Sequence, residues 1–353
     1  MLTLLRPAIL LAVVAAAATA APQAAQAPEI RGPFRMQNLV TFGDSYTDEG
    51  RYDHFEKNHE APPEGRPLFP SNKTFSGGYA WPHFVANFSG ARTYNYAVGG
   101  AMCSYDLIHR TLDATQGPFP DVLDYQVPAF KKDAAYWYLY PEHRPDNTVY
   151  ALWIGTNDLG PDGFLDNKQQ PGQTIDDFVE CAWRVFDQLY AFGGRRFVLF
   201  NMLPLESAPM YAAPATSGRG NTIYWRDPAA YDVAAYVERM RLATVEVNAK
   251  LRDDMPVQVQ ESHRWPDADV TLLDAHAIFT DVLAQPDAYL DAPADVTTPK
   301  RVCLDQCVES PNPLSSFMWY DELHPAEKME QILSQSFNNN IHGRDMYGTT
   351  YRG

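Results

Sequence analysis

Short apolar runs recur along the chain, and most of them end at a glycine or a small polar residue. Five of these runs are rich in β-branched and aromatic residues and too short for helices, a pattern that predicts buried β-strands. The predicted strands cover residues 39–42, 93–98, 148–154, 196–201 and 270–273.

Segments with a helical period alternate with these strands. The clearest runs from Ile175 to Phe192, where apolar positions recur every three or four residues and Gly193-Gly194 ends the pattern. Further helices are predicted over residues 80–88, 127–138, 231–255, 275–284 and 326–340, whereas residues 51–78 show no usable periodicity. Apolar strands that alternate with helices predict one α/β domain, in which helices cover both faces of a parallel sheet.

The N-terminus has the form of a secretory signal peptide. Arg6 precedes an apolar stretch, and Ala18-Thr19-Ala20 supplies the small residues of a cleavage site. The stretch is shorter than the about 20 apolar residues that span a bilayer, so we expect no membrane anchor. We predict a secreted monomer with a signal peptide over 1–20, a linker over 21–35, one domain over 36–345 and a tail over 346–353.

Charge and cysteine content add constraints on partners and on crosslinks. The chain has 44 acidic and 28 basic residues, and its formal charge of −16 argues against nucleic acid or anionic membranes as partners. In an oxidising compartment Cys303 and Cys307 are predicted to form a small-loop disulfide, because no second Cys/His pair stands beside them to complete a zinc site. Cys103 and Cys181 could pair with each other or remain free, and the sequence leaves both possibilities open.

Two segments match the acceptor motif for N-glycosylation. They are Asn72-Lys73-Thr74 and Asn87-Phe88-Ser89. Since secretion is expected, we predict a glycan on Asn72 and another on Asn87.

Chemically useful residues follow three of the predicted strands. Ser45 stands two residues after the glycine that ends the first strand, Gly100 closes the second, and Asn157 follows the third. The carboxyl ends of parallel strands share one edge of a sheet, so these residues should converge there. Taken singly, each has a structural alternative, since a serine can cap a helix and a Gly-Gly pair can simply turn the chain.

Near the C-terminus the sequence Asp321-Glu-Leu-His324-Pro supplies the partners that a serine nucleophile needs. His324 can accept the proton of Ser45, and Asp321 can orient the imidazole, although Asp-x-x-His could also be a helix-capping arrangement. The backbone N–H groups of Ser45 and Gly100 and the amide of Asn157 can bind an oxyanion. The combination predicts acyl transfer through a Ser-His-Asp triad.

These segments resemble the four sequence blocks of the SGNH superfamily, the GDSL lipases and esterases. The matching blocks are Phe42-Gly43-Asp44-Ser45, residues 95–100, Gly155-Thr156-Asn157-Asp158 and residues 321–325. The resemblance implies a flavodoxin-like, three-layer α/β/α sandwich around a five-stranded parallel sheet, and a site without metal or cofactor. It favours Gly100 as the second oxyanion donor, with Gly99 as the alternative.

One departure from the GDSL signature narrows the resemblance. Tyr46 replaces the leucine, and with the segments Tyr-Ala-Val-Gly-Gly-Ala and Leu-Pro-Leu-Glu-Ser-Ala-Pro it is similar to secreted fungal acetylesterases of carbohydrate esterase family 16. That resemblance implies an acetylesterase acting on plant cell-wall oligosaccharides. Trp153, Trp319 and Tyr320 lie close to the expected site and could stack on sugars, although single aromatic residues more often pack in a core.

Two alternatives to an acetylesterase stay open. A GDSL lipase or lysophospholipase would use the same catalytic residues but needs an apolar rim to hold a long acyl chain. An inactive sugar-binding module could share the fold, but none of the four block residues is missing.

Overall fold

The computed structural model describes residues 34–212, 222–224, 232–303, 306–344 and 346–353. The predicted signal peptide and nearly all of the predicted linker lie outside these residues. No described helix is both long enough and apolar enough to cross a membrane.

The five predicted strands form one parallel sheet. They are β1 (Asn38–Gly43), β2 (Arg92–Asn95), β5 (Thr148–Trp153), β6 (Arg196–Phe200) and β7 (Asp269–Leu273). Their order across the sheet is β2-β1-β5-β6-β7, with every neighbouring pair parallel. The sheet therefore brings the carboxyl ends of β1, β2 and β5 side by side, as the strand-end argument requires.

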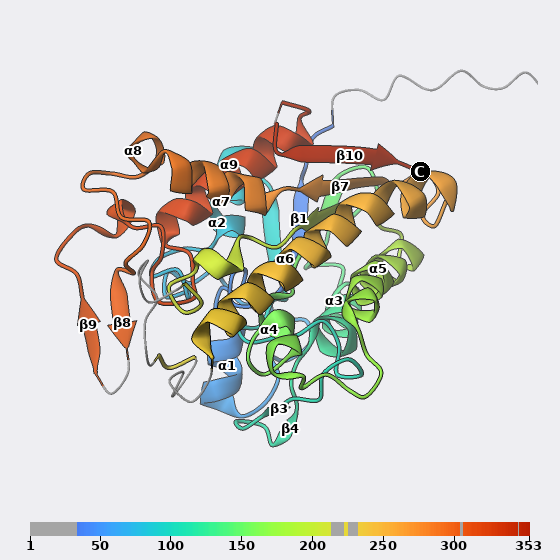
Figure 1. Cartoon of the computed structure of the whole chain (residues 1–353). Coiled ribbons are helices and arrows are strands. Elements are labelled where there is room, and N and C mark those ends of the chain that lie inside the picture. The colour runs from blue at the N-terminus through green and yellow to red at the C-terminus, as the bar shows by residue number, and fades with distance from the viewer. Residues whose placement is uncertain (1–33, 213–221, 225–231, 304–305, 345) are drawn as a thin grey trace, which may run out of the picture. The chain divides into compact units, whose positions relative to one another are not determined.

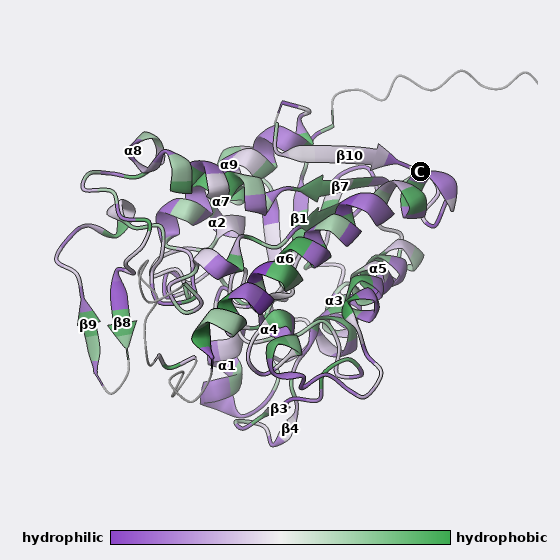
Figure 2. Cartoon of the chain, in the orientation of Figure 1, coloured by the Kyte–Doolittle hydropathy of each residue, from purple (hydrophilic) through white to green (hydrophobic). Residues whose placement is uncertain are grey.

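A sixth strand corrects the expectation of five. β10 (Gly348–Arg352) lies in the predicted C-terminal tail and pairs antiparallel with β7, where the hydroxyls of Thr271 and Thr350 are 2.8 Å apart. Its sequence, Gly-Thr-Thr-Tyr-Arg, has no apolar run because an edge strand is largely exposed. Figure 2 shows the contrast between apolar β7 and the more polar β10 beside it.

Helices cover the sheet in two layers, which confirms the three-layer architecture (Figure 1). One layer contains α2 (Trp81–Ser89), α7 (Ala275–Ala284) and α9 (Glu327–Ile341). The other contains α3 (Val127–Asp133), α5 (Ile175–Ala191) and α6 (Val233–Pro256). α3 ends at Asp133 instead of the predicted residue 138, because the chain turns there. Tyr138 lies beyond this turn, and its hydroxyl donates to the Gly65 carbonyl at 3.1 Å.

Smaller elements decorate this frame. They are the helices α1 (Arg51–Asn58), α4 (Thr156–Leu159) and α8 (Pro286–Tyr289), the π-helical turns Val122–Gln126 and Val257–Glu261, the 3-10 turns Phe164–Asp166, Leu205–Ser207 and Leu314–Ser316, and two hairpins, β3 (Thr111–Leu112) with β4 (Gly117–Pro118) and β8 (Arg301–Cys303) with β9 (Cys307–Glu309).

Helix α1 falls in the segment that was expected to be irregular. Only Arg51 and Phe55 of its residues are buried, so the sequence carries no apolar stripe that could reveal a helix. The helix is stabilised instead by the side chain of Asp48, which accepts hydrogen bonds from the backbone N–H groups of Gly50, Arg51 and Tyr52 at 2.6–2.9 Å. Such bonds satisfy the free donors at the start of a helix.

Two disulfides link segments that lie outside the central sheet. Cys303 and Cys307 are bonded across the β8–β9 hairpin, as predicted. Cys103 and Cys181 are bonded as well, which decides between the two possibilities that the sequence left open. This second bond ties the chain that follows β2 to helix α5.

Candidate active site

The turn after β1 places Ser45 at the carboxyl edge of the sheet. Gly43, the last residue of β1, has φ +148°, and a Cβ atom there would lie 2.1 Å from the carbonyl oxygen of Trp153 in β5. Only glycine fits so close to a neighbouring backbone. The Gln126 side chain holds the same glycine, accepting from its N–H at 2.9 Å and donating to its carbonyl at 2.8 Å.

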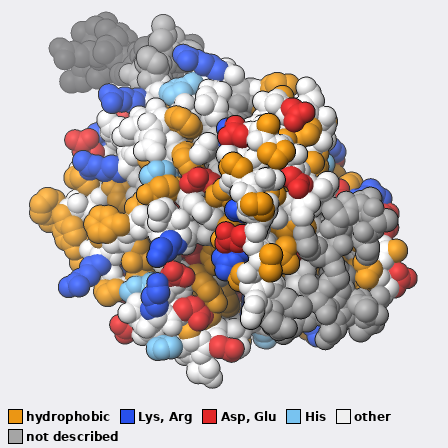
Figure 3. Space-filling model, turned by 90° about the vertical axis from the view of Figure 1, so that its left-hand side faces the viewer, with side chains coloured by type: hydrophobic (Ala, Val, Ile, Leu, Met, Phe, Trp, Pro, Cys, Tyr) orange, Lys and Arg blue, Asp and Glu red, His pale blue; other side chains and the backbone are white. Residues whose placement is uncertain are grey.

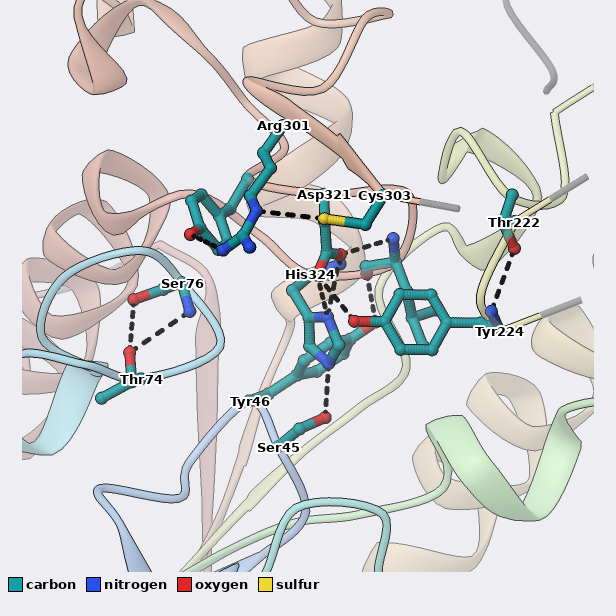
Figure 4. A network of polar contacts seen from close by, with 12 residues as sticks. Ser45, Tyr46, Thr74, Ser76, Thr222, Tyr224, Arg301, Cys303, Asp321 and His324 are labelled. Carbon is teal, nitrogen blue, oxygen red and sulfur yellow. Dashed lines mark hydrogen bonds and ion pairs between the residues drawn. The ribbon is translucent and has the colours of Figure 1, made fainter. Parts of the chain in front are cut away.

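A continuous chain of hydrogen bonds links Ser45 to two residues from the far end of the sequence (Figure 4). Ser45 Oγ lies 2.8 Å from His324 Nε2, and His324 Nδ1 lies 2.8 and 3.0 Å from the two oxygens of Asp321. All three residues are buried. The sequence separates Ser45 from His324 by 279 positions, so the fold alone creates this contact.

The loop that carries His324 keeps Asp321 ionised. Burial acts to raise the pKa of Asp321, but the charge and hydrogen bond of His324 outweigh it. The backbone N–H groups of Leu323 and His324 also donate to Oδ1, at 2.9 and 2.8 Å. The pKa of Asp321 therefore lies below its ordinary value, so the carboxylate stays charged beside the imidazole.

Three aromatic rings surround the imidazole of His324. Phe75 stacks on it with ring centres 5.0 Å apart, while Tyr46 and Tyr224 meet it edge-on at 5.8 and 5.3 Å. The Tyr224 hydroxyl also donates to Asp321 Oδ2 at 2.8 Å. These contacts fix the ring on several sides.

The contacts of Tyr46 show what a tyrosine contributes at the position where the GDSL signature has leucine. Its hydroxyl donates to the Leu323 carbonyl at 3.0 Å, and its ring packs on Trp153. A leucine could fill part of this space but could not make that hydrogen bond. Tyr46 thus joins the turn that holds Ser45 directly to the loop that holds His324.

The hydrogen bonds of Gly99, Gly100 and Asn157 bear on which of them could bind an oxyanion. The Gly99 N–H already donates to Asp48 Oδ2 at 2.7 Å, whereas the Gly100 N–H has no partner among the described residues. The Asn157 amide donates one hydrogen to the Ala101 carbonyl at 3.0 Å, which leaves the other available. This pattern favours Gly100 over Gly99 as the second oxyanion donor, a choice that the sequence left open.

A cavity of about 440 Å³ opens beside the hydrogen-bonded chain. Its lining residues come from five segments of the described chain and are Asp53, Asn72, Lys73, Thr74, Phe75, Gly77, Ile223, Tyr224, Arg301, Cys303, Tyr320 and Asp321. Of the three aromatics proposed from the sequence to contact sugars, only Tyr320 lines the cavity. Trp153 and Trp319 are 1% and 0% exposed, so the structure assigns them to the core.

Sequence reasoning missed several residues of the site. Phe75 and Arg301 carried no signal, because neither stands in a recognisable motif or at a predicted strand end. Tyr224, by contrast, could be suggested from the sequence, because it is an aromatic residue in a long Pro/Gly/aromatic segment after the fourth strand, and such a long segment in a compact domain is often functional.

The fold and this geometry define an α/β protein with the side-chain arrangement of a serine hydrolase. Residues 39–337 match the family model described as GDSL-like Lipase/Acylhydrolase, and the chain belongs to that family. It is a carboxylic ester hydrolase, as the sequence predicted.

Two acetylesterases are among its relatives. One from Hypocrea jecorina is 36% identical over 316 residues, covering 88% of this chain and 90% of the relative. One from Thermothelomyces thermophilus is 33% identical over 178 residues, covering 48% of this chain and 55% of the relative. The solved structure of an acetylxylan esterase from Geobacillus stearothermophilus aligns at 15% identity over 88% of this chain and 96% of that one, with a TM-score of 0.38, a likeness too weak to argue from.

Proposed function

We propose that the protein is a secreted serine esterase that removes acetyl groups from oligosaccharides of the plant cell wall. The observation that carries this proposal is the hydrogen-bonded chain Ser45–His324–Asp321, which stands beside a cavity lined by both charged and apolar side chains. The 36% identity to an acetylesterase supports the acetyl specificity. The two disulfides and the signal-like N-terminus support secretion.

The proposed mechanism forms and breaks an acyl-enzyme. Ser45 Oγ attacks the ester carbonyl as its proton passes to His324 Nε2, and Asp321 stabilises the imidazolium. The N–H groups of Ser45 and Gly100 and the Asn157 amide bind the oxyanion. His324 then protonates the leaving alcohol, and water deacylates Ser45 by the same steps in reverse.

Acyl length distinguishes this function from that of a lipase. A lipase gains about 0.8 kcal/mol for each buried CH₂, so its rate rises with chain length. The cavity here includes two cationic and two acidic side chains, Lys73, Arg301, Asp53 and Asp321. In Figure 3 charged side chains likewise stand between the hydrophobic ones on the part of the surface that is not grey. The charged side chains of the cavity do not suit the continuous apolar rim of a lipase.

The test compares esters of increasing chain length. We expect kcat/KM to be highest for acetyl and to fall steeply through butyryl, octanoyl and palmitoyl esters, with acetate released from acetylated xylo-oligosaccharides. The Ser45→Ala variant should keep its melting temperature and lose essentially all turnover, and a serine-directed phosphonate should label Ser45 alone. A rate that climbs with chain length, without acetate release, would assign the protein to the lipases.

A further inference from the structure

Two cations line the cavity, Arg301 at the start of β8 and Lys73 in the segment between α1 and α2. The protein as a whole has a formal charge of −16, so an anion gains nothing from the general field of the molecule. Any anion that binds here has to be attracted locally, by these two side chains.

Arg301 is held in place by groups that do not neutralise it. Its guanidinium donates to the Tyr320 hydroxyl at 2.9 Å and to the sulfurs of Cys303 and Cys307 at 3.1 and 2.9 Å. These acceptors carry no charge, and sulfur is a weak acceptor. The nearest carboxylate oxygen that forms an ion pair with Arg301, on Glu309, is 4.0 Å away. The side chain is thus oriented, partly exposed and still able to attract an anion.

Neither carboxylate that lines the cavity forms an ion pair with these cations within the described part of the chain. Asp53 pairs instead with Lys57 at 3.2 Å. Asp321 is occupied by His324, by Tyr224 and by two backbone N–H groups. The positive charge of Arg301 and Lys73 is therefore available to a ligand.

The leaving alcohol of an ester faces this cavity. His324 has to deliver a proton to the leaving oxygen, so the alcohol lies on the imidazole side of the site. Phe75 and Tyr224, which both contact the imidazole, line the cavity, although Ser45 and His324 themselves are not among its lining residues.

We propose that Arg301 and Lys73 form a subsite for a carboxylate on the alcohol part of the substrate, so that the preferred ester is an acetylated oligosaccharide bearing a uronic acid. A guanidinium offers paired N–H donors that match a carboxylate. The volume of about 440 Å³ leaves room for a sugar unit beyond the reacting ester. This inference rests on the proposed deacetylation of oligosaccharides.

The experiment measures kcat/KM for two acetylated xylo-oligosaccharides of equal length, one with a uronic acid substituent and one without. The wild type should prefer the acidic ester by roughly tenfold, and added salt should reduce that preference. Arg301→Gln should abolish most of the preference, and Lys73→Gln, at an exposed position, should reduce it less. The matched control is Arg352→Gln on β10, where an 83% exposed arginine lies far from the β8–β9 hairpin (Figure 1).

Equal loss on both esters in Arg301→Gln would mean that Arg301 only holds the hairpin, and the subsite would be rejected. A wild type that does not distinguish the two esters would reject it as well. If neither oligosaccharide releases acetate while 4-nitrophenyl acetate is hydrolysed, the proposed function fails and the subsite falls with it. Acetate release from both substrates at equal rates overturns the subsite alone.

Discussion

Tyr224 holds the outer end of the hydrogen-bonded chain, through its bond to Asp321 Oδ2 at 2.8 Å. Burial and the neighbouring charge of Asp321 raise the pKa of this phenol, so the hydroxyl stays protonated and donates. It draws negative charge away from the carboxylate and limits its movement. We therefore propose that Tyr224 acts on the reaction through Asp321, as a positioning residue.

Removing this hydroxyl should alter both rate and pH dependence. In Tyr224→Phe the Asp321 carboxylate loses a hydrogen bond that favours its charged form, so the pKa of Asp321 should rise. We expect kcat/KM to fall about tenfold and the acid limb of its pH profile to move up by about half a unit. Steady-state assays across pH 4–9 would measure both. Tyr138→Phe, which loses a hydroxyl remote from the site, is the control, and an unmoved acid limb would leave Tyr224 with a packing role only.

Asn157 offers a separate test of the proposed oxyanion site. One of its amide hydrogens is fixed on the Ala101 carbonyl, so the other should bind the oxygen that becomes charged in the transition state. Asn157→Ala should lower kcat by roughly 10²–10³ with little change in KM. A large rise in KM at constant kcat would show instead that Asn157 binds the ground state.

Single residues differ in how far the sequence predicts them. Ser45, Gly100 and Asn157 could be found because each stands where a predicted strand ends, and those ends must meet. Phe75 and Arg301 could not, because their roles come from contacts with residues far away in the sequence. Trp153 was misplaced for the opposite reason, since a strand-end position does not say whether a ring faces the cavity or the core.

At the level of elements, the Cys103–Cys181 disulfide ties the segment after β2 to helix α5 across 78 positions. Cys303–Cys307 spans only 4. The entropy that a crosslink removes from the unfolded chain grows with loop length, so the first bond should contribute about 4 kcal/mol and the second about 2 kcal/mol.

Thermal unfolding of two double variants would compare these bonds. Cys103→Ser/Cys181→Ser should lower Tm by about 6 °C, and Cys303→Ser/Cys307→Ser by about half as much. The second variant serves as the control for removing two sulfurs. An equal or larger drop in the short-loop variant would contradict the entropic account.

Elements with a buried face were predictable and exposed ones were not. The strands β1, β5, β6 and β7 and the long helices carry the apolar pattern that burial imposes, whereas the apolar signal that predicted edge strand β2 comes from the buried residues 96–98 directly after it. β10 and α1 were not predicted, because both elements are mostly exposed. β10 depends on pairing with β7, and α1 depends on hydrogen bonds to Asp48, so neither leaves an apolar pattern in its own sequence.

For the whole molecule, buried carboxyl groups should set the pH range of stability. Burial raises the pKa of Asp44 and Asp158 to about 7, and that of Glu49 and Asp121 to about 8. Because these folded values exceed the unfolded ones, the stabilisation is complete below about pH 4 and is lost as pH rises through 7 and 8. Asp321 has the opposite effect on the pH dependence of stability. Because its folded pKa is lowered, its ionised form stabilises the fold at neutral pH, and this contribution is lost as the pH falls through the folded pKa.

Melting curves at constant ionic strength would test this balance. We expect Tm to be about 5–10 °C higher at pH 5 than at pH 8. Glu49→Gln, which cannot ionise, should narrow the difference, whereas Glu60→Gln at an exposed position should not. A Tm that rises from pH 5 to pH 8 would contradict the assignment of neutral buried acids.

Asn72, which lines the cavity and begins a predicted glycosylation motif, has a further consequence. A glycan there would keep carbohydrate permanently tethered at the mouth of a site proposed to receive carbohydrate, at an effective concentration in the millimolar range. Preparations with and without this glycan should therefore differ in KM for oligosaccharide esters but not for small synthetic acetates. Endoglycosidase treatment should lower the KM, and Asn87→Gln, whose side chain lies on α2, should leave that response intact. The host that makes the protein would then set part of its apparent substrate range.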